Sequence, residues 1–164
     1  MNDEDDISES MRQAKRLDRW PSLYRVAIHE YAHFHVAREF GIAGRVYLAP
    51  RDEGDAIYVE LFAGRFVPNC SLIDCHATQI IALAGKCGDR ILEFKDLASA
   101  RQIYADLYSG EMKLSDGDEA LAGEYYEHHV SEALAIVRLH WPVIVRDASI
   151  HAAEMKRHET ETTG

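Results

Sequence analysis

Residues 29 to 33 read His-Glu-Tyr-Ala-His, and this motif constrains the chain more than any other stretch. Histidines four residues apart on an α-helix lie on one face, one turn apart, so His29 and His33 can turn two imidazoles toward one point. Two imidazoles can hold a zinc ion and leave room for a third protein ligand and a water molecule. The carboxylate of Glu30 can accept a proton from that water. The motif predicts a zinc site with Glu30 as general base.

A helix over residues 21–40 should carry the motif. Pro21 suits the first turn of a helix, and Gly41 suits its C-terminal cap. Apolar residues recur between them at spacings of three and four, which predicts a helix buried on most of its surface. These residues are Leu23, Val26, Ala27, Ala32, Val36, Ala37 and Phe40. Two histidines and a glutamate inside such a helix need polar partners. His35 falls on another face and is left out of the site.

Composition limits the classes of protein that the chain can belong to. With 164 residues, of which 47% are hydrophobic, it is long enough for one domain with a sizeable core. A formal net charge of −10 argues against nucleic-acid binding, since phosphates need a basic face. The apolar runs fall far short of the ~20 residues that span a membrane, and the acidic N-terminus does not resemble a secretory signal. We expect a cytoplasmic protein without nucleic-acid or membrane partners.

The cysteines also favour a reducing compartment. Cys70, Cys75 and Cys87 are an odd number and too few for a disulfide framework. The neighbours Cys75 and His76 lack a second pair of ligands, so we expect small buried core residues there rather than a metal site. The later histidines are expected on helical surfaces, at positions 128, 129, 140, 151 and 158.

The hydrophobic pattern predicts a mostly α-helical fold with a small β-hairpin or sheet, an α+β arrangement with the motif helix in the core. Besides the motif helix, helices are expected at residues 71–94, 97–108, 118–140 and 142–158. Strands are expected at residues 45–50 and 56–62, joined by a turn at residues 51–55. Gly85 and Gly88 indicate close packing of one helix against another.

The same pattern predicts a single domain over residues 19–158. Residues 1–18 form an acidic and flexible segment in this prediction, with a short helix at residues 11–20. Residues 159–164, of sequence ETETTG, are too polar to pack and are expected to be a flexible tail.

A zinc site with two histidines is incomplete and needs a third ligand from further along the chain. A metzincin-type extension of the motif fails, because Val36 stands where its glycine should be and Glu39 where its third histidine should be. Carboxylates offer the alternatives, and four positions stay open. These are Asp89 and Glu93 on the predicted helix 71–94, and Asp116 and Asp118 near the start of a later helix.

Four segments together resemble the peptidase domain of the membrane-bound AAA proteases of the FtsH type, peptidase family M41. They cover about residues 20 to 146 in the family's order, and they read VAIHEYAHFHVA, RVYLAPRDEGDAIYVEL, IALAGKCGDRIL and SDGDEALAGEYY. The resemblance implies a zincin-like helical domain with one zinc ion per chain. It also implies His29 and His33 as ligands, Glu30 as base and Asp118 as third ligand, with Ala122 at the family's spacing after it.

The chain departs from the family at several points. Ala32 replaces the glycine before the second histidine, and Asp89 replaces the glutamate of the family's AAE segment. No phosphate-binding loop of the form GxxxxGK[ST] occurs, and neither the ATPase module nor the transmembrane segments are present. An active enzyme would therefore be limited to flexible or unfolded polypeptides, or would depend on a separate ATPase or on self-association.

The resulting expectation is a zinc-dependent metallopeptidase. Tyr31 and Tyr125 are candidates for stabilising the oxyanion, and the strand at residues 56–62 could bind an extended peptide by strand addition. Two other functions stay open. The first is a non-catalytic metal-binding or interaction module that keeps the peptidase fold, and the second is a regulatory protease that cuts one specific repressor.

Overall fold

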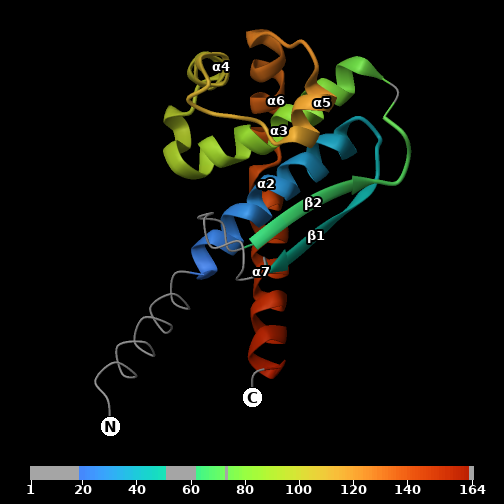
Figure 1. Ribbon diagram of the computed structural model, residues 1–164, viewed down its shortest axis with the longest axis vertical. Helices are drawn as coiled ribbons and strands as arrows, with labels where there is room; N and C mark the ends of the chain where they lie inside the picture. The colour runs from blue at the N-terminus through green and yellow to red at the C-terminus, as the bar shows by residue number, and fades with distance from the viewer. Residues whose placement is uncertain (1–18, 51–61, 73, 163–164) are drawn as a thin grey trace.

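The computed structural model describes residues 19–50, 62–72 and 74–162 (Figure 1). This part of the chain is mostly helical with one two-stranded sheet, as predicted. The elements follow one another as α2 (Arg19–Glu39), β1 (Gly44–Pro50), β2 (Phe62–Pro68), α3 (Cys75–Phe94), the 3-10 helix η2 (Lys95–Leu97), α4 (Ala100–Ser109), α5 (Asp116–Ala122), α6 (Glu127–Leu139) and α7 (Trp141–Thr162). The predicted turn at 51–55, the acidic segment and residues 11–18 of the short helix predicted at 11–20 lie outside the described residues, while residues 19 and 20 belong to α2.

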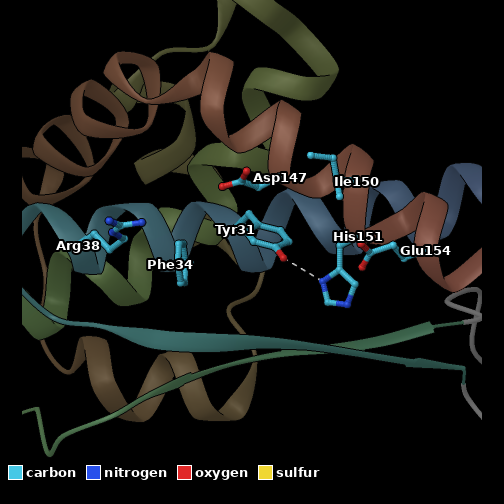
Figure 2. Close-up of a pocket in the computed structure, with 7 residues that line it drawn as sticks. All are labelled: Tyr31, Phe34, Arg38, Asp147, Ile150, His151 and Glu154. Atoms are coloured by element: carbon cyan, nitrogen blue, oxygen red, sulfur yellow. Dashed lines mark hydrogen bonds between the residues drawn. The ribbon is translucent and has the colours of Figure 1, made fainter.

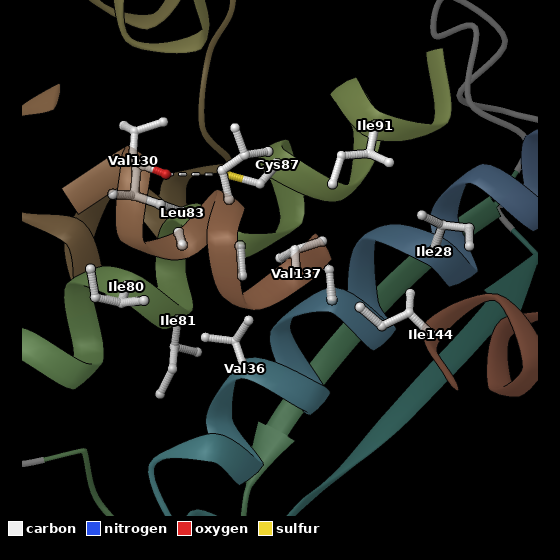
Figure 3. Packing of buried hydrophobic residues seen from close by; sticks show 14 of the residues in the cluster. Ile28, Val36, Ile80, Ile81, Leu83, Cys87, Ile91, Val130, Val137 and Ile144 are labelled. Atoms are coloured by element: carbon white, nitrogen blue, oxygen red, sulfur yellow. Dashed lines mark hydrogen bonds between the residues drawn. The ribbon is translucent and has the colours of Figure 1, made fainter. Parts of the chain in front are cut away.

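Helix α2 forms the centre of the hydrophobic core, which confirms the prediction of a largely buried motif helix. It packs against α3, α6, α7 and both strands. Its apolar side chains share one cluster with residues of α3, α6 and α7, including Ile28, Val36, Ile80, Val137 and Ile144 (Figure 3). Burial of such a cluster is the main favourable contribution to folding. It places the motif on a helix that the surrounding elements hold from several sides.

Close contact between α2 and α3 depends on the glycines of α3. A Cβ atom on Gly88 would lie 3.0 Å from the Cβ of Ala32, so the small residue lets the two helices approach. This contact confirms the packing role predicted for Gly88. Helix α3 starts at Cys75 rather than at residue 71, because the Asp74 side chain caps it by accepting a hydrogen bond from the backbone N–H of Ala77.

The sheet is an antiparallel pair in which Tyr47 faces Arg65. The first strand was predicted correctly. The second spans Phe62–Pro68, so the prediction ended it too early at residue 62, and residues 56–61 of the predicted strand lie outside the described residues. Gly64 and Pro68 misled the prediction because both disfavour strand interiors. In the structure Gly64 lets β2 approach α2, since a Cβ there would lie 2.6 Å from both Val26 Cγ1 and Glu30 Cγ. Pro68 ends the strand.

The helix predicted at 118–140 is two helices. Gly123, with a φ of 56°, ends α5, and α6 begins at Glu127 in a new direction. Helix α7 continues to Thr162, so residues 159–162 are helical rather than part of a flexible tail. The prediction was wrong there because a polar segment needs no packing partner to continue an existing helix.

The burial predicted for three residues was also wrong. Cys75 is exposed and so is its neighbour His76, because both occupy the first turn of α3, where the side chains project from the core. His129 is buried, although it was expected on a solvated face, and its Nδ1 accepts a hydrogen bond from the backbone N–H of Tyr126 at the start of α6. Among the described residues, no helix is long and apolar enough to cross a membrane.

Candidate metal centre

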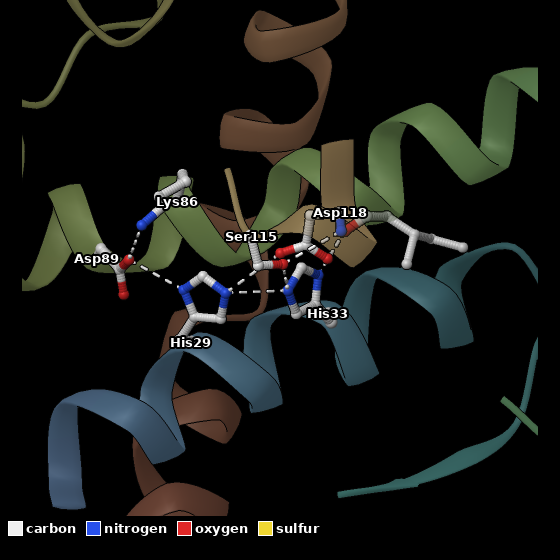
Figure 4. Close-up of polar contacts among 7 residues, drawn as sticks. His29, His33, Lys86, Asp89, Ser115 and Asp118 are labelled. Atoms are coloured by element: carbon white, nitrogen blue, oxygen red, sulfur yellow. Dashed lines mark hydrogen bonds and ion pairs between the residues drawn. The ribbon is translucent and has the colours of Figure 1, made fainter. Parts of the chain in front are cut away.

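Three side chains from two distant parts of the chain converge on one point (Figure 4). His29 and His33 come from successive turns of α2, and their Nε2 atoms lie 3.1 Å apart. Asp118 comes from α5, and its Oδ2 lies 3.6 Å from Nε2 of His29 and 3.5 Å from Nε2 of His33. Donors about 2.0–2.1 Å from a tetrahedral zinc ion are separated by about 3.3 Å. The triangle therefore matches the spacing of three ligand atoms around one tetrahedral zinc ion.

Hydrogen bonds from the opposite ring nitrogens orient the two imidazoles. Nδ1 of His33 donates to the backbone carbonyl of Ile81 at 2.6 Å, and Nδ1 of His29 donates to the carboxylate of Asp89 at 2.9 Å. With Nδ1 protonated, the lone pair of a neutral imidazole is on Nε2, which faces the centre. Carboxylate and carbonyl partners of this kind are typical of metal-binding histidines.

Gly85 of α3 lies directly against both imidazoles. A Cβ atom at this position would come within 2.3 Å of Nε2 of His29 and 2.5 Å of Nε2 of His33. The absence of a side chain here leaves the space that the converging nitrogen atoms, and an ion between them, require. Sequence reasoning assigned Gly85 a packing role only. The signal that could have indicated a role at the site was the position of Gly85 within IALAGKCGDRIL, one of the segments that resemble the M41 family.

Asp118 is free to face the imidazoles because another residue caps its helix. The hydroxyl of Ser115 accepts a hydrogen bond from the backbone N–H of Asp118 at 3.1 Å, so Ser115 is the N-cap of α5. The other open candidates lie elsewhere. Asp116 is exposed and outside the cluster, Asp89 bonds to the far side of His29, and Glu93 pairs with Arg90 at 3.5 Å.

The Glu30 carboxylate follows His29 directly on α2 and is only 9% exposed. Its Oε1 lies close to the backbone of β2. If Gly64 carried a Cβ atom, that atom would lie 3.1 Å from Oε1 of Glu30. Neither oxygen forms a hydrogen bond with another described residue, and both retain contact with solvent. The Glu30 carboxylate is therefore not tied up in a structural hydrogen bond within the described part of the chain.

Tyr31 lies on the opposite side of α2 from the three candidate ligands, about 200° around the helix from each motif histidine. Its hydroxyl bonds to Nδ1 of His151 at 3.0 Å, beside a cavity of about 360 Å³ between α2 and α7 (Figure 2). The proposed oxyanion role for Tyr31 was therefore wrong. Tyr125 packs against Tyr104, with ring centroids 6.2 Å apart. His35, left out of the site, bonds to Asp147 at 2.7 Å.

Charge at the centre shifts the pKa of two of these groups strongly. Burial alone lowers the pKa of His29, but the carboxylates of Asp89 and Asp118 outweigh that effect and raise it to about 10. Burial alone raises the pKa of Asp118, but the adjacent imidazoles of His29 and His33 outweigh it and hold the pKa well below its usual range. In the metal-free protein, a charged His29 therefore lies between two carboxylates.

We predict that the metal-free protein loses stability as the pH rises from about 6.5 toward 10. A histidine whose folded pKa exceeds its unfolded value of 6.5 stabilises the fold fully below pH 6.5, and this contribution is lost as the pH rises through the folded pKa. Urea unfolding of chelator-treated protein between pH 6.5 and 9 should show a falling midpoint, and His29→Gln should flatten it. A midpoint that does not change with pH in the parent protein would contradict the assigned charge state.

No protein-family model matches this chain, and no curated protein is detectably similar to it. A function therefore has to follow from the geometry of the centre.

Proposed function

We propose that this protein is a zinc-dependent metallopeptidase whose site resembles that of the M41 peptidases. The observation that carries the proposal is the triangle of His29 Nε2, His33 Nε2 and Asp118 Oδ2, with edges of 3.1, 3.5 and 3.6 Å. Two histidines and one carboxylate with an open fourth position are the ligand set of catalytic rather than structural zinc sites. Glu30, next to this set, supplies the base.

Each residue of the centre has a defined role in the proposed reaction. His29, His33 and Asp118 would hold a zinc ion, and Asp89 and the Ile81 carbonyl would orient the imidazoles. The ion would supply the Lewis acidity that polarises a peptide carbonyl and lets water lose a proton near neutral pH. Glu30 would take that proton and pass it to the leaving amine, as general base and then general acid.

We propose that the substrate is a flexible or unfolded polypeptide, and that a folded substrate requires a separate ATPase or self-association of this chain. The strand-addition role of residues 56–62 stays a prediction, because all of them except Phe62 lie outside the described residues. The three cysteines are free, which fits the reducing cytoplasm that we propose as the location.

The decisive experiment measures metal content and proteolysis together. Protein purified without chelators should contain one zinc ion per chain and should cleave an unstructured protein such as casein. Asp118→Asn keeps the size of the side chain but removes the charge, so it should weaken zinc binding and abolish cleavage at low zinc concentration. Chelation of the zinc should lower the melting temperature, since a ligand that binds only the folded state stabilises it.

Each other result has a defined meaning. Stoichiometric zinc without any cleavage would favour the non-catalytic module, and cleavage of one particular protein but not of casein would favour the repressor-specific protease. Protein that neither contains nor takes up a transition metal would overturn the proposal.

A further inference from the structure

Helix α5, which carries Asp118, has few contacts of its own to hold it in place. It is only seven residues long, and Ala122 is its one buried residue. A helix this short is not stable in isolation, because its few hydrogen bonds do not offset the conformational entropy lost when the first turn forms. The position of the Asp118 carboxylate relative to the imidazoles must therefore depend on contacts between α5 and the rest of the fold. Helix α3 provides them, and the two helices lie side by side (Figure 1).

One polar side chain of α3 joins it to the end of α5. The amide nitrogen of Gln79 donates to the backbone carbonyl of Ala122 at 3.0 Å and to that of Glu124 at 2.6 Å. Ala122 is the last residue of α5, and a carbonyl group at a helix C-terminus has no partner within the helix, so it is free for such a bond. Glu124 follows directly after the C-cap residue Gly123. The cap at the other end, from Ser115, lies within the same segment and does not tie α5 to α3.

Gln79 therefore links the third candidate ligand to the helix that already touches the other two. Helix α3 contributes the Ile81 carbonyl that orients His33 and the Gly85 backbone that lies against both imidazoles. The two hydrogen bonds of Gln79 fix the C-terminal end of α5 on this same helix, one turn beyond Asp118. Contacts with α3 therefore position all three candidate ligands.

We infer that Gln79 is a positioning residue, which holds α5 so that the Asp118 carboxylate completes the metal site. The inference rests on the proposed metal site and adds a residue outside the ligand set to it. Among the described residues, the side-chain hydrogen bonds of Gln79 go to Ala122 and Glu124 and to neither the candidate ligands nor Glu30. Its removal should loosen Asp118 and leave the two histidines in place.

The test replaces Gln79 with methionine, which has a similar length and helix propensity but no donor. Zinc affinity, measured by competition with a chromophoric chelator, should fall about 10- to 100-fold, the usual range for partners that orient ligands. The visible spectrum of the cobalt-substituted variant should lose the intensity of a four-coordinate site. Gln102→Met is the matched control, because Gln102 also donates a side-chain hydrogen bond, but to Asp106 within its own helix α4, so this bond ties no other element to the ligands. It should leave affinity and spectrum unchanged.

A double-mutant cycle separates positioning from general loss of stability. If Gln79 acts through Asp118, then Gln79→Met should add little further loss of zinc affinity in an Asp118→Asn background. Equal zinc affinity and an equal cobalt spectrum in the parent protein and Gln79→Met would overturn the inference, and so would additive losses in the double variant. A parent protein that binds no metal would instead overturn the proposed function. The two failures are therefore distinguishable.

Discussion

Glu30→Gln is expected to abolish proteolysis without loss of zinc. Glutamine has the same shape as glutamate but cannot accept the proton that water must lose, and a general base contributes about 10²- to 10⁴-fold to the rate. Since Glu30 is not one of the three converging groups, zinc content should stay at one ion per chain. The measurement is kcat/KM on casein or a fluorogenic peptide, with zinc determined by atomic spectroscopy on the same samples.

Glu39→Gln provides the matched control on the same helix. Glu39 is exposed at the C-terminal end of α2 and pairs with His140 at 2.8 Å, so its replacement should leave kcat/KM unchanged. Retention of most of the activity in Glu30→Gln would remove Glu30 from the mechanism, even if the zinc site itself were established.

Gly85→Ala should prevent metal binding although it adds only one methyl group. The new Cβ would meet Nε2 of His29 at 2.3 Å and Nε2 of His33 at 2.5 Å, distances at which the imidazoles must move. Moving them breaks the convergence with Asp118 and strains the contact between α2 and α3. Overpacking of this kind costs about 1–3 kcal/mol of stability. We expect zinc affinity to fall by at least 100-fold, about 2.7 kcal/mol or more, with a lower melting temperature.

Gly117→Ala is the control for the effect of adding a methyl group. Gly117 lies on α5 beside Asp118, and a Cβ there would have no atom within 4 Å, so zinc affinity should be retained. Alanine also favours helix more than glycine does, so α5 should gain stability rather than lose it. Unchanged zinc binding in Gly85→Ala would show that the imidazoles do not occupy the positions described.

Local signals in the sequence were sufficient for the elements whose pattern is regular. The apolar spacing around His29 and His33 predicted the buried helix, and Gly88 predicted a close helix contact. The strand over residues 63–68 was missed because Gly64 looks like a strand breaker until the approach of β2 to α2 is known. The break at Gly123 was missed because a single glycine in a helical pattern can be tolerated, and only the course of α6 shows that it ends α5.

The sequence by itself determined which chemistry is available. A spacing of four puts two imidazoles on one face of a helix, with a carboxylate beside the first, whatever surrounds them. Only the tertiary structure decided which of the four candidate carboxylates lies beside the two imidazoles. The answer depends on how α5 packs on α3, and no local spacing of residues in the sequence encodes that packing. The tertiary structure also decided that Asp89 orients His29, that Gly85 clears the space between the rings, and that Tyr31 faces away. Contacts between residues far apart in the chain arise from packing of the whole core, which no short motif encodes.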